Sequence, residues 1–124
     1  MLLALTPVDY THLAKVVKVE AALNTMDEYC VAVSVLNRVK SPEFPNTVSG
    51  VVHDSGQYEG MWVNNPVVDP ALVKRLQDKS KMLSAYDIIG KRTDFKGQTM
   101  MEYRVPLEDP MCHPSGNFYH YYWQ

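Results

Sequence analysis

The sequence predicts an α+β domain that is mainly helical. Segments with helix-capping signals occupy most of residues 7–89, and two short alternating segments that are typical of strands follow them. The 124 residues fit a single domain, 1–124, and the hydrophobic content of 46% is enough for one core. No internal repeat, linker or low-complexity stretch divides the chain.

The first predicted helix covers residues 7–23. Thr6 is a suitable N-cap, Pro7 fits the first turn, and Asp9 places an acid near the positive end of the helix dipole. Apolar residues recur at helical spacing, and Glu20 lies on the same stripe. A carboxylate where a hydrophobic residue is expected makes Glu20 the first candidate for chemistry.

The second predicted helix covers residues 25–39. Thr25 and Glu28 have the spacing of a capping box. Residues 31–36 are apolar on nearly all sides, so we expect this helix to be central and buried. It should end before Pro42, because the residue that precedes a proline disfavours helical geometry.

Shorter elements complete the predicted fold. Thr47 is a suitable cap for a short helix, and a longer helix is predicted over residues 70–89 with Gly90 as its stop. Residues 99–105 and 117–123 alternate in the manner of strands. A small β lobe is therefore expected beside a helical body.

The composition argues against several classes of function. A net charge of −2 and a pI near 6.0 do not fit a general nucleic-acid-binding protein. No apolar run reaches the ~18–20 residues of a membrane span, so we expect no membrane insertion. The four histidines lack zinc-ligand spacing and no phosphate-binding loop is present, so we expect no metal and no cofactor.

The sequence contains two cysteines, Cys30 and Cys112. Cys30 lies in an apolar helical run, and we interpret it as a buried thiol rather than a nucleophile. A disulfide between the two is the less favoured alternative.

Glu20 and two amides are the candidate site residues that the pattern itself supplies. Burial raises the pKa of a carboxylate and keeps it protonated near neutral pH, as a general acid requires. The alternative, which periodicity alone favours, is a glutamate that reaches water or pairs with a lysine. Asn37 and Gln57 could bind sugar hydroxyls, although capping and loop hydrogen bonds explain each of them singly. The many aromatic side chains of the sequence could line a groove or build the core.

The sequence also resembles a known family. The pair Glu20-Ala21 is followed by VAVSVLNRV, SPEFPNTVSGVV and the GQY turn at 56–58, in the order typical of SleB-type cell-wall hydrolases, the group of spore cortex-lytic enzymes. Asn117-Phe118-Tyr119 is similar to the motif at the end of the family domain.

This resemblance implies a lysozyme-like fold and cleavage of peptidoglycan glycan strands between N-acetylmuramic acid and N-acetylglucosamine. It implies that Glu20 is the single catalytic acid of a lytic transglycosylase. It further implies that Gln57, Tyr58, Asn117 and Tyr119 contact the substrate.

The sequence departs from the family pattern directly after Glu20. Family members commonly continue with a Gly-Glu pair that residues 22–24 lack, and Asp27 or Glu28 could replace this second acid. A hydrolase that uses two carboxylates is a further alternative, with Asp54 or Glu59 as the second.

The N-terminal residues do not fit a signal peptide, and so we expect a phage enzyme that stays in the host cytoplasm until lysis or is carried in the virion. The competing interpretation is a structural tail or baseplate component that binds other virion proteins and has little or no activity.

Overall fold

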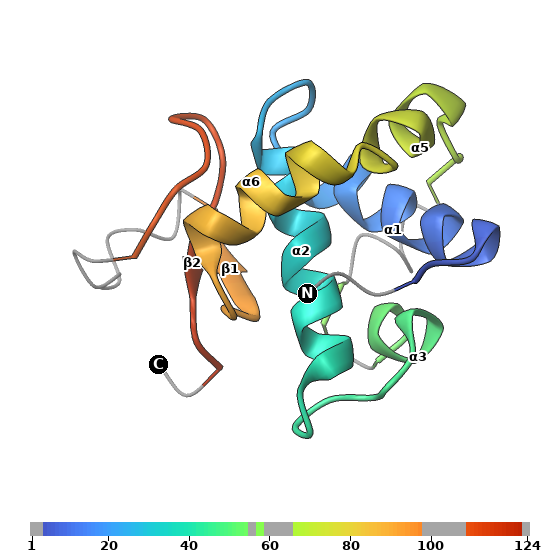
Figure 1. Ribbon diagram of the computed structural model, residues 1–124, viewed down its shortest axis with the longest axis horizontal. Helices are drawn as coiled ribbons and strands as arrows, with labels where there is room; N and C mark the ends of the chain where they lie inside the picture. The colour runs from blue at the N-terminus through green and yellow to red at the C-terminus, as the bar shows by residue number, and fades with distance from the viewer. Residues whose placement is uncertain (1–3, 55–56, 59–65, 98–108, 123–124) are drawn as a thin grey trace.

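The computed structural model describes residues 4–54, 57–58, 66–97 and 109–122 (Figure 1). Within these ranges the elements are α1 (Pro7–Glu20), α2 (Asp27–Lys40), α3 (Val48–Val52), α5 (Pro70–Leu76), α6 (Lys79–Ile89), β1 (Asp94–Lys96) and β2 (Phe118–His120).

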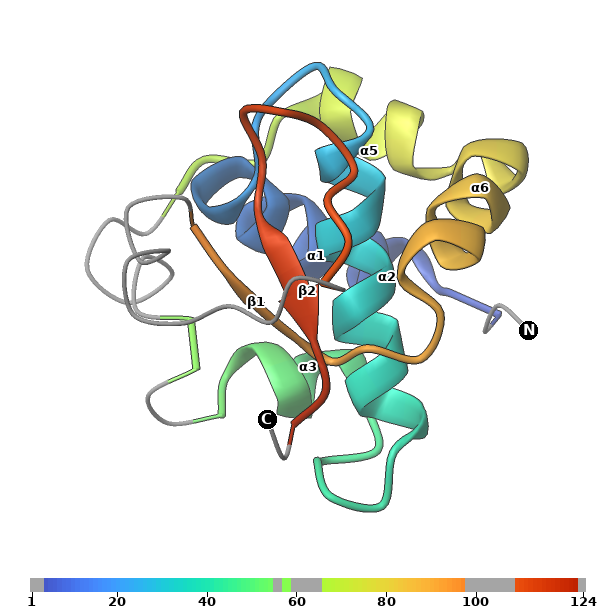
Figure 2. The same ribbon diagram turned by 90° about the vertical axis from the view of Figure 1, so that its left-hand side faces the viewer.

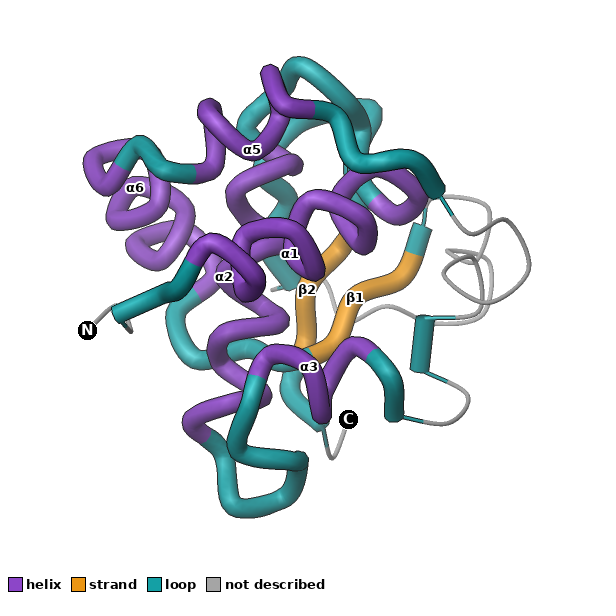
Figure 3. Tube along the Cα trace, turned by 90° about the vertical axis from the view of Figure 1, so that its right-hand side faces the viewer, coloured by secondary structure: helices purple, strands orange, loops and turns teal. Residues whose placement is uncertain are grey.

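Helix α2 is the centre of the molecule. Every residue from Asp27 to Arg38 is buried, and α2 contacts the helices α1, α3, α5 and α6 as well as β1. In Figure 1, α1, α3 and α5 lie on one side of α2 and the small sheet lies on the other, and Figure 3 shows the same arrangement from the helical side. The prediction of a central, buried second helix is confirmed.

Helix α1 begins as predicted and ends earlier. Thr6 and Asp9 form the reciprocal capping box, with hydrogen bonds of 3.2 and 3.0 Å. The helix stops at Glu20 rather than at residue 23, because the Ala22 N–H donates to the Asp27 carboxylate instead of to the preceding turn. Asn24 then takes a left-handed conformation with a φ of 61°, which reverses the chain.

The predicted capping box of α2 is wrong. The helix begins after Met26, which makes no side-chain cap hydrogen bond. Thr25 accepts from the Asp27 N–H instead, and Glu28 accepts from the Asn24 N–H. Thr25 and Glu28 therefore accept hydrogen bonds from other N–H groups than those of a capping box. The spacing of the two residues alone could not distinguish these partners.

The predicted helix over 70–89 consists of two helices. α5 ends at Leu76, and Asp78 caps α6 by accepting from the Lys81 N–H at 3.1 Å. An aspartate with this capping ability is the sequence signal that marks the break. Gly90 ends α6 with a φ of 59°, as its position predicted.

The sheet consists of β1 and β2, paired antiparallel with Phe95 opposite Tyr119 (Figure 2). The predicted strand over 117–123 is confirmed as the shorter β2, whereas β1 was not predicted. The predicted strand over 99–105 lies outside the described residues.

The interpretation of Cys30 as a free thiol is also wrong. Cys30 and Cys112 form a disulfide that joins the first turn of α2 to the segment before β2, with their Cα atoms 6.6 Å apart. The two residues are 82 positions apart in the sequence, so only the tertiary fold brings them together.

Candidate active site

Glu20 is the last residue of α1 and is half-buried. Burial raises the pKa of its carboxyl above the ordinary value of 4.5. Among the described residues, no hydrogen bond or ion pair engages this carboxylate. Its backbone carbonyl is fixed, because the Asn117 Nδ2 donates to it at 2.9 Å. The backbone at the end of α1 is thus anchored, while the Glu20 side chain keeps its carboxyl group without a partner among the described residues.

Asp27 anchors the loop that follows Glu20. Its fully buried carboxylate accepts hydrogen bonds from the Ala22 N–H at 3.0 Å, from the Asn117 N–H and Nδ2 at 3.2 and 2.9 Å, and from the Tyr119 hydroxyl at 2.6 Å. Burial, followed by the charge of Asp27, raises the pKa of Tyr119, which keeps the hydroxyl a donor. Asp27 therefore ties the end of α1 to β2.

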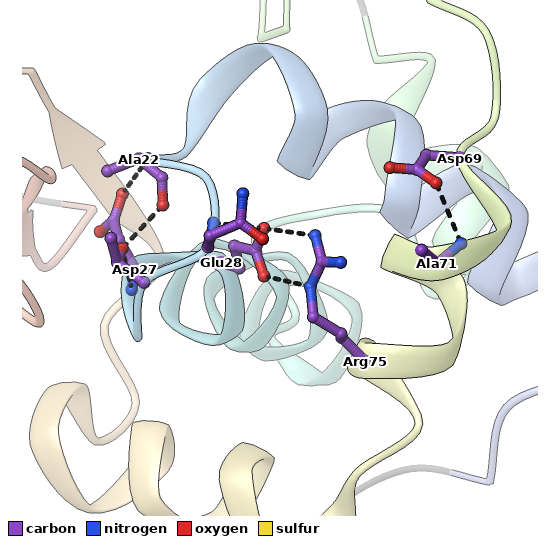
Figure 4. A network of polar contacts seen from close by, with 8 residues as sticks. Ala22, Asp27, Glu28, Asp69, Ala71 and Arg75 are labelled. Atoms are coloured by element: carbon purple, nitrogen blue, oxygen red, sulfur yellow. Dashed lines mark hydrogen bonds and ion pairs between the residues drawn. The ribbon is translucent and has the colours of Figure 1, made fainter.

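Glu28 holds the same loop from its other side (Figure 4). Its buried carboxylate accepts from the Asn24 N–H at 2.8 Å and forms a bidentate pair with Arg75 of α5, at 3.0 and 2.9 Å. A bidentate arginine is among the strongest partners for a buried carboxylate. Two adjacent acids thus fix the loop between α1 and α2 to different parts of the fold.

Gly116 fits closely against Asp27. A Cβ at position 116 would lie 2.5 Å from the Asp27 Cγ and 2.7 Å from its Oδ1. The chain before β2 can approach the carboxylate only because this residue has no side chain. The glycine therefore allows the Asn117 backbone and side chain to reach Asp27.

Arg38 organises the other end of the site. It is 4% exposed and donates from Nε to the Thr93 carbonyl at 2.7 Å and from Nη1 to the Gln57 Oε1 at 2.6 Å. Its guanidinium also lies 5.3 Å from the centre of the Tyr58 ring. The arginine of the NRV motif therefore joins α2 to the GQY turn and to β1.

Tyr58 lies within electrostatic range of Glu20. Burial, with smaller contributions from carboxylates that include Glu20 and Asp54, raises the pKa of Tyr58 to about 12. The hydroxyl is buried without a hydrogen-bond partner among the described residues. Glu20, Tyr58 and Arg38 thus belong to one neighbourhood.

The structure brings the sequence-predicted residues together but gives most of them a supporting position. Tyr58, Asn117 and Tyr119 are 1%, 6% and 0% exposed, which leaves almost no surface for direct contact with a sugar. Gln57 is exposed, although its amide oxygen is bound to Arg38. Of these four residues, only Gln57 is exposed enough for direct contact with a substrate.

Sequence reasoning missed the importance of Asp27 and Arg38. The sequence indicated Asp27 only as a possible replacement for the second acid, and it indicated no role for Arg38. The available signal was a charged residue at each end of a helix that was predicted to be buried, because charged residues are rarely buried without a partner.

Residues 24–122 match the family whose description is Cell Wall Hydrolase. The chain belongs to the cell wall hydrolase family. The match begins after Glu20, so it covers the residues that hold Glu20 in place and not the glutamate itself. A search of curated proteins found no match.

Two solved structures are similar to this cell wall hydrolase. The catalytic domain of the germination-specific lytic transglycosylase SleB from Bacillus anthracis has a TM-score of 0.67 and 19% identity, over 94% of this chain and 96% of that chain. The catalytic domain of the Bacillus cereus SleB protein has a TM-score of 0.64 and 20% identity, over 94% and 91%. The predictions of the family, of a lysozyme-like fold and of a cell-wall-degrading enzyme are confirmed.

Other kinds of site are not evident in this cell wall hydrolase. Within the described ranges, no group of three or more acidic, histidine or cysteine side chains could hold a metal ion. In the same part of the chain, no helix is long and apolar enough to cross a membrane.

Proposed function

We propose that this enzyme cleaves the glycosidic bond between N-acetylmuramic acid and N-acetylglucosamine by lytic transglycosylation, with Glu20 as acid and base. The observation that carries the proposal is a half-buried carboxyl of raised pKa, at the end of a helix whose following loop is fixed by two buried acids. Membership of the cell wall hydrolase family supports the choice of substrate.

The chemistry needs one carboxyl group. Protonated Glu20 donates its proton to the glycosidic oxygen, and the bond from C1 of muramic acid to that oxygen breaks. The resulting carboxylate then accepts the proton of the muramic 6-hydroxyl, whose oxygen bonds to C1 and closes a 1,6-anhydro ring. The proton count balances, Glu20 is regenerated, and no water is consumed.

The acids beside Glu20 support the single-acid mechanism. Asp27 accepts four hydrogen bonds and Glu28 is paired with Arg75, so neither has a free oxygen at which to activate water. We propose that they act as positioning residues in place of the Gly-Glu pair that the sequence lacks. The hydrolytic alternative needs a second carboxylate. Of its two candidates, Asp54 is half-buried and Glu59 lies outside the described residues.

The decisive experiment is mass spectrometry of muropeptides that the enzyme releases from purified sacculi. Wild type should yield products about 18 Da lighter than hydrolysed ones and without a reducible end, since a 1,6-anhydro ring has lost one water. Glu20→Gln should yield no product, with an unchanged circular dichroism spectrum. Reducing ends would replace the transglycosylase proposal with a hydrolase, and equal release by both proteins would remove Glu20 from catalysis.

The place of action that we propose is the cell wall, reached at lysis from the host cytoplasm or carried there by a phage particle. The Cys30–Cys112 disulfide supports action in an oxidising environment, because structural disulfides rarely persist in a reducing cytoplasm. Mass spectrometry of purified particles would distinguish a virion protein from a soluble lysin.

A further inference from the structure

A cavity of about 490 Å³ lies at the C-terminal end of α2. The buried side chains of Asn37 and Thr93 contribute to its floor, and exposed residues of the loop after α2 and of the chain after α6 contribute to its rim. Its volume is within the range of about 300–1,000 Å³ that is usual for small-ligand sites.

This cavity lies at the opposite end of α2 from the loop that follows Glu20. The loop that follows Glu20 is held by Asp27, which is the first residue of α2. Asn37 and Lys40, which line the cavity, lie in the last turn of the same helix. A helix rises 1.5 Å per residue, so the two ends of α2 are about 20 Å apart. A ligand group bound in the cavity would therefore lie far from the loop that follows Glu20.

The rim carries charges of both signs. Lys40 and Lys91 are exposed cations, and Glu43, which also lines the cavity, is an exposed anion. Burial, followed by the charge of Lys91, lowers the pKa of Lys40, and an anion placed between the two lysines would relieve this repulsion. The cavity is therefore suited to a ligand with a carboxylate and an amine.

The floor adds a hydrogen-bond acceptor. Asn37 donates both hydrogens of its amide group, to the carbonyls of Gly90 and Arg92 at 2.8 and 2.7 Å. Its orientation is thereby fixed, and its carbonyl oxygen is the atom left to accept from a ligand. A peptide N–H is a suitable donor for it.

Aromatic rings form the walls. Tyr86, Tyr121 and Tyr122 line the cavity, and Tyr122 is 54% exposed although its ring is large and partly apolar. Phe44 contacts the Tyr122 ring edge-on at 5.2 Å, and the Arg92 guanidinium lies 4.7 Å from the Tyr121 ring, so both rings have neighbours that restrict them. Such rings offer apolar surface to methyl and methylene groups.

We propose that this cavity binds the peptide stem of peptidoglycan, a short chain with carboxylates, a diamino acid and alanine methyl groups. The carboxylate lies between Lys40 and Lys91, the amine faces Glu43, and a peptide N–H donates to Asn37. The inference rests on the proposed function, because it makes the stem a second recognition element on the polymer that Glu20 cleaves.

The first test is an NMR titration of the whole chain with a synthetic stem tetrapeptide, L-Ala-γ-D-Glu-L-Lys-D-Ala. We expect the NMR resonances of the Asn37 side-chain amide and of the tyrosines that line the cavity to shift when the peptide is added. The double variant Lys40→Glu/Lys91→Glu should raise the Kd at least about fivefold, since both cations are reversed. Lys74→Glu on α5, an exposed lysine outside the cavity, is the matched control and should bind as wild type does.

The second test compares cleavage of intact sacculi with cleavage of glycan strands whose stems an amidase has removed. The double variant should be slower than wild type on sacculi and equal to it on stripped glycan. If wild type cuts neither polymer, the proposed function fails, whereas the titration still decides whether the cavity binds the stem.

Three results would overturn the proposal. The first is the absence of any shift in the cavity with the peptide, and the second is an equal Kd for wild type and the double variant. The third is a cavity that responds to a stem-free disaccharide or to a glycerol-phosphate oligomer while the peptide has no effect.

Discussion

At the scale of single residues, the proposed catalytic acid Glu20 shows how local burial changes the properties of a carboxyl group. Burial alone raises the pKa of its carboxyl. A general acid must be protonated at the working pH, so a partly dehydrated position is an advantage that a water-exposed glutamate lacks. The same dehydration makes the ionised form unfavourable for the folded protein.

The pH dependence of cleavage follows from the raised pKa of Glu20. Cleavage should be greatest at mildly acidic pH and decline as the pH rises through the raised pKa of Glu20, because the proton donor is then lost. Initial rates on sacculi between about pH 4 and pH 8 measure this, with the fold monitored by circular dichroism. A rate that rises steadily to pH 8 would contradict the role of acid.

The contribution of Glu20 to stability should change with pH in the same direction as cleavage. A raised pKa in the folded state means that the contribution of Glu20 is present below its ordinary value of 4.5 and is lost as the pH rises. Glu20→Gln should therefore be more stable than wild type near neutral pH, and the difference in Tm should shrink toward pH 4.

Tyr58 permits a test of whether a buried hydroxyl takes part in catalysis. The hydroxyl has no partner among the described residues, so Tyr58→Phe should keep or increase the free energy of unfolding, by about 1 kcal/mol. Cleavage should be retained, because the side chain is 1% exposed. Tyr10→Phe, at a half-buried position on α1, serves as the control. Lost cleavage with intact stability would show that the hydroxyl reaches Glu20 or the sugar.

At the scale of elements, the position of Glu20 depends on how α1, α2 and β2 meet. The helix end is held through its backbone carbonyl and through Ala22, and both contacts lead to Asn117 or Asp27. Because Asn117 immediately precedes β2, a shift of that strand would be transmitted to the end of α1, where the proposed catalytic acid lies.

Gly116→Ala should disturb this junction. Its Cβ would overlap Asp27, and we expect a loss of about 1–3 kcal/mol in the free energy of unfolding, together with reduced cleavage. Gly97→Ala is a matched control, since the nearest atom to its Cβ, the Asn117 Oδ1, is 3.9 Å away. Urea denaturation of the two variants measures the difference, and equal stabilities would show that the segment before β2 moves aside without cost.

At the scale of the whole molecule, the disulfide links the helical body to the small sheet. It closes a loop of 82 residues, and cross-links of this span contribute up to about 4–5 kcal/mol by restricting the unfolded chain. It also keeps the segment before β2 against α2, which is where Asp27 and Asn117 meet.

Reduction should therefore lower both the Tm and the rate of cleavage. The variant Cys30→Ala/Cys112→Ala should behave as reduced wild type does, and reductant should not change it further. Thermal unfolding and sacculus digestion with and without reductant measure these effects. Full activity after complete reduction would show that the sheet stays in register without the covalent link.

The sequence alone predicted what depends on neighbours along the chain. Thr6 and Thr47 cap helices through side-chain hydrogen bonds to N–H groups three residues on, and such bonds are visible as local patterns. The apolar run of α2 predicted its burial, and the order of motifs indicated the family. The position of Glu20 on an apolar stripe was likewise a local signal.

The tertiary structure decided what depends on distant partners. Glu28 pairs with an arginine 47 positions away, Asp27 bonds to an asparagine 90 positions away, and Cys30 joins a cysteine 82 positions away. No periodicity reports such distances, so the capping box of α2 and the thiol at Cys30 were predicted incorrectly. Local hydrogen bonds form wherever the sequence allows them, whereas a buried charge is stable only beside the partner that the completed fold supplies.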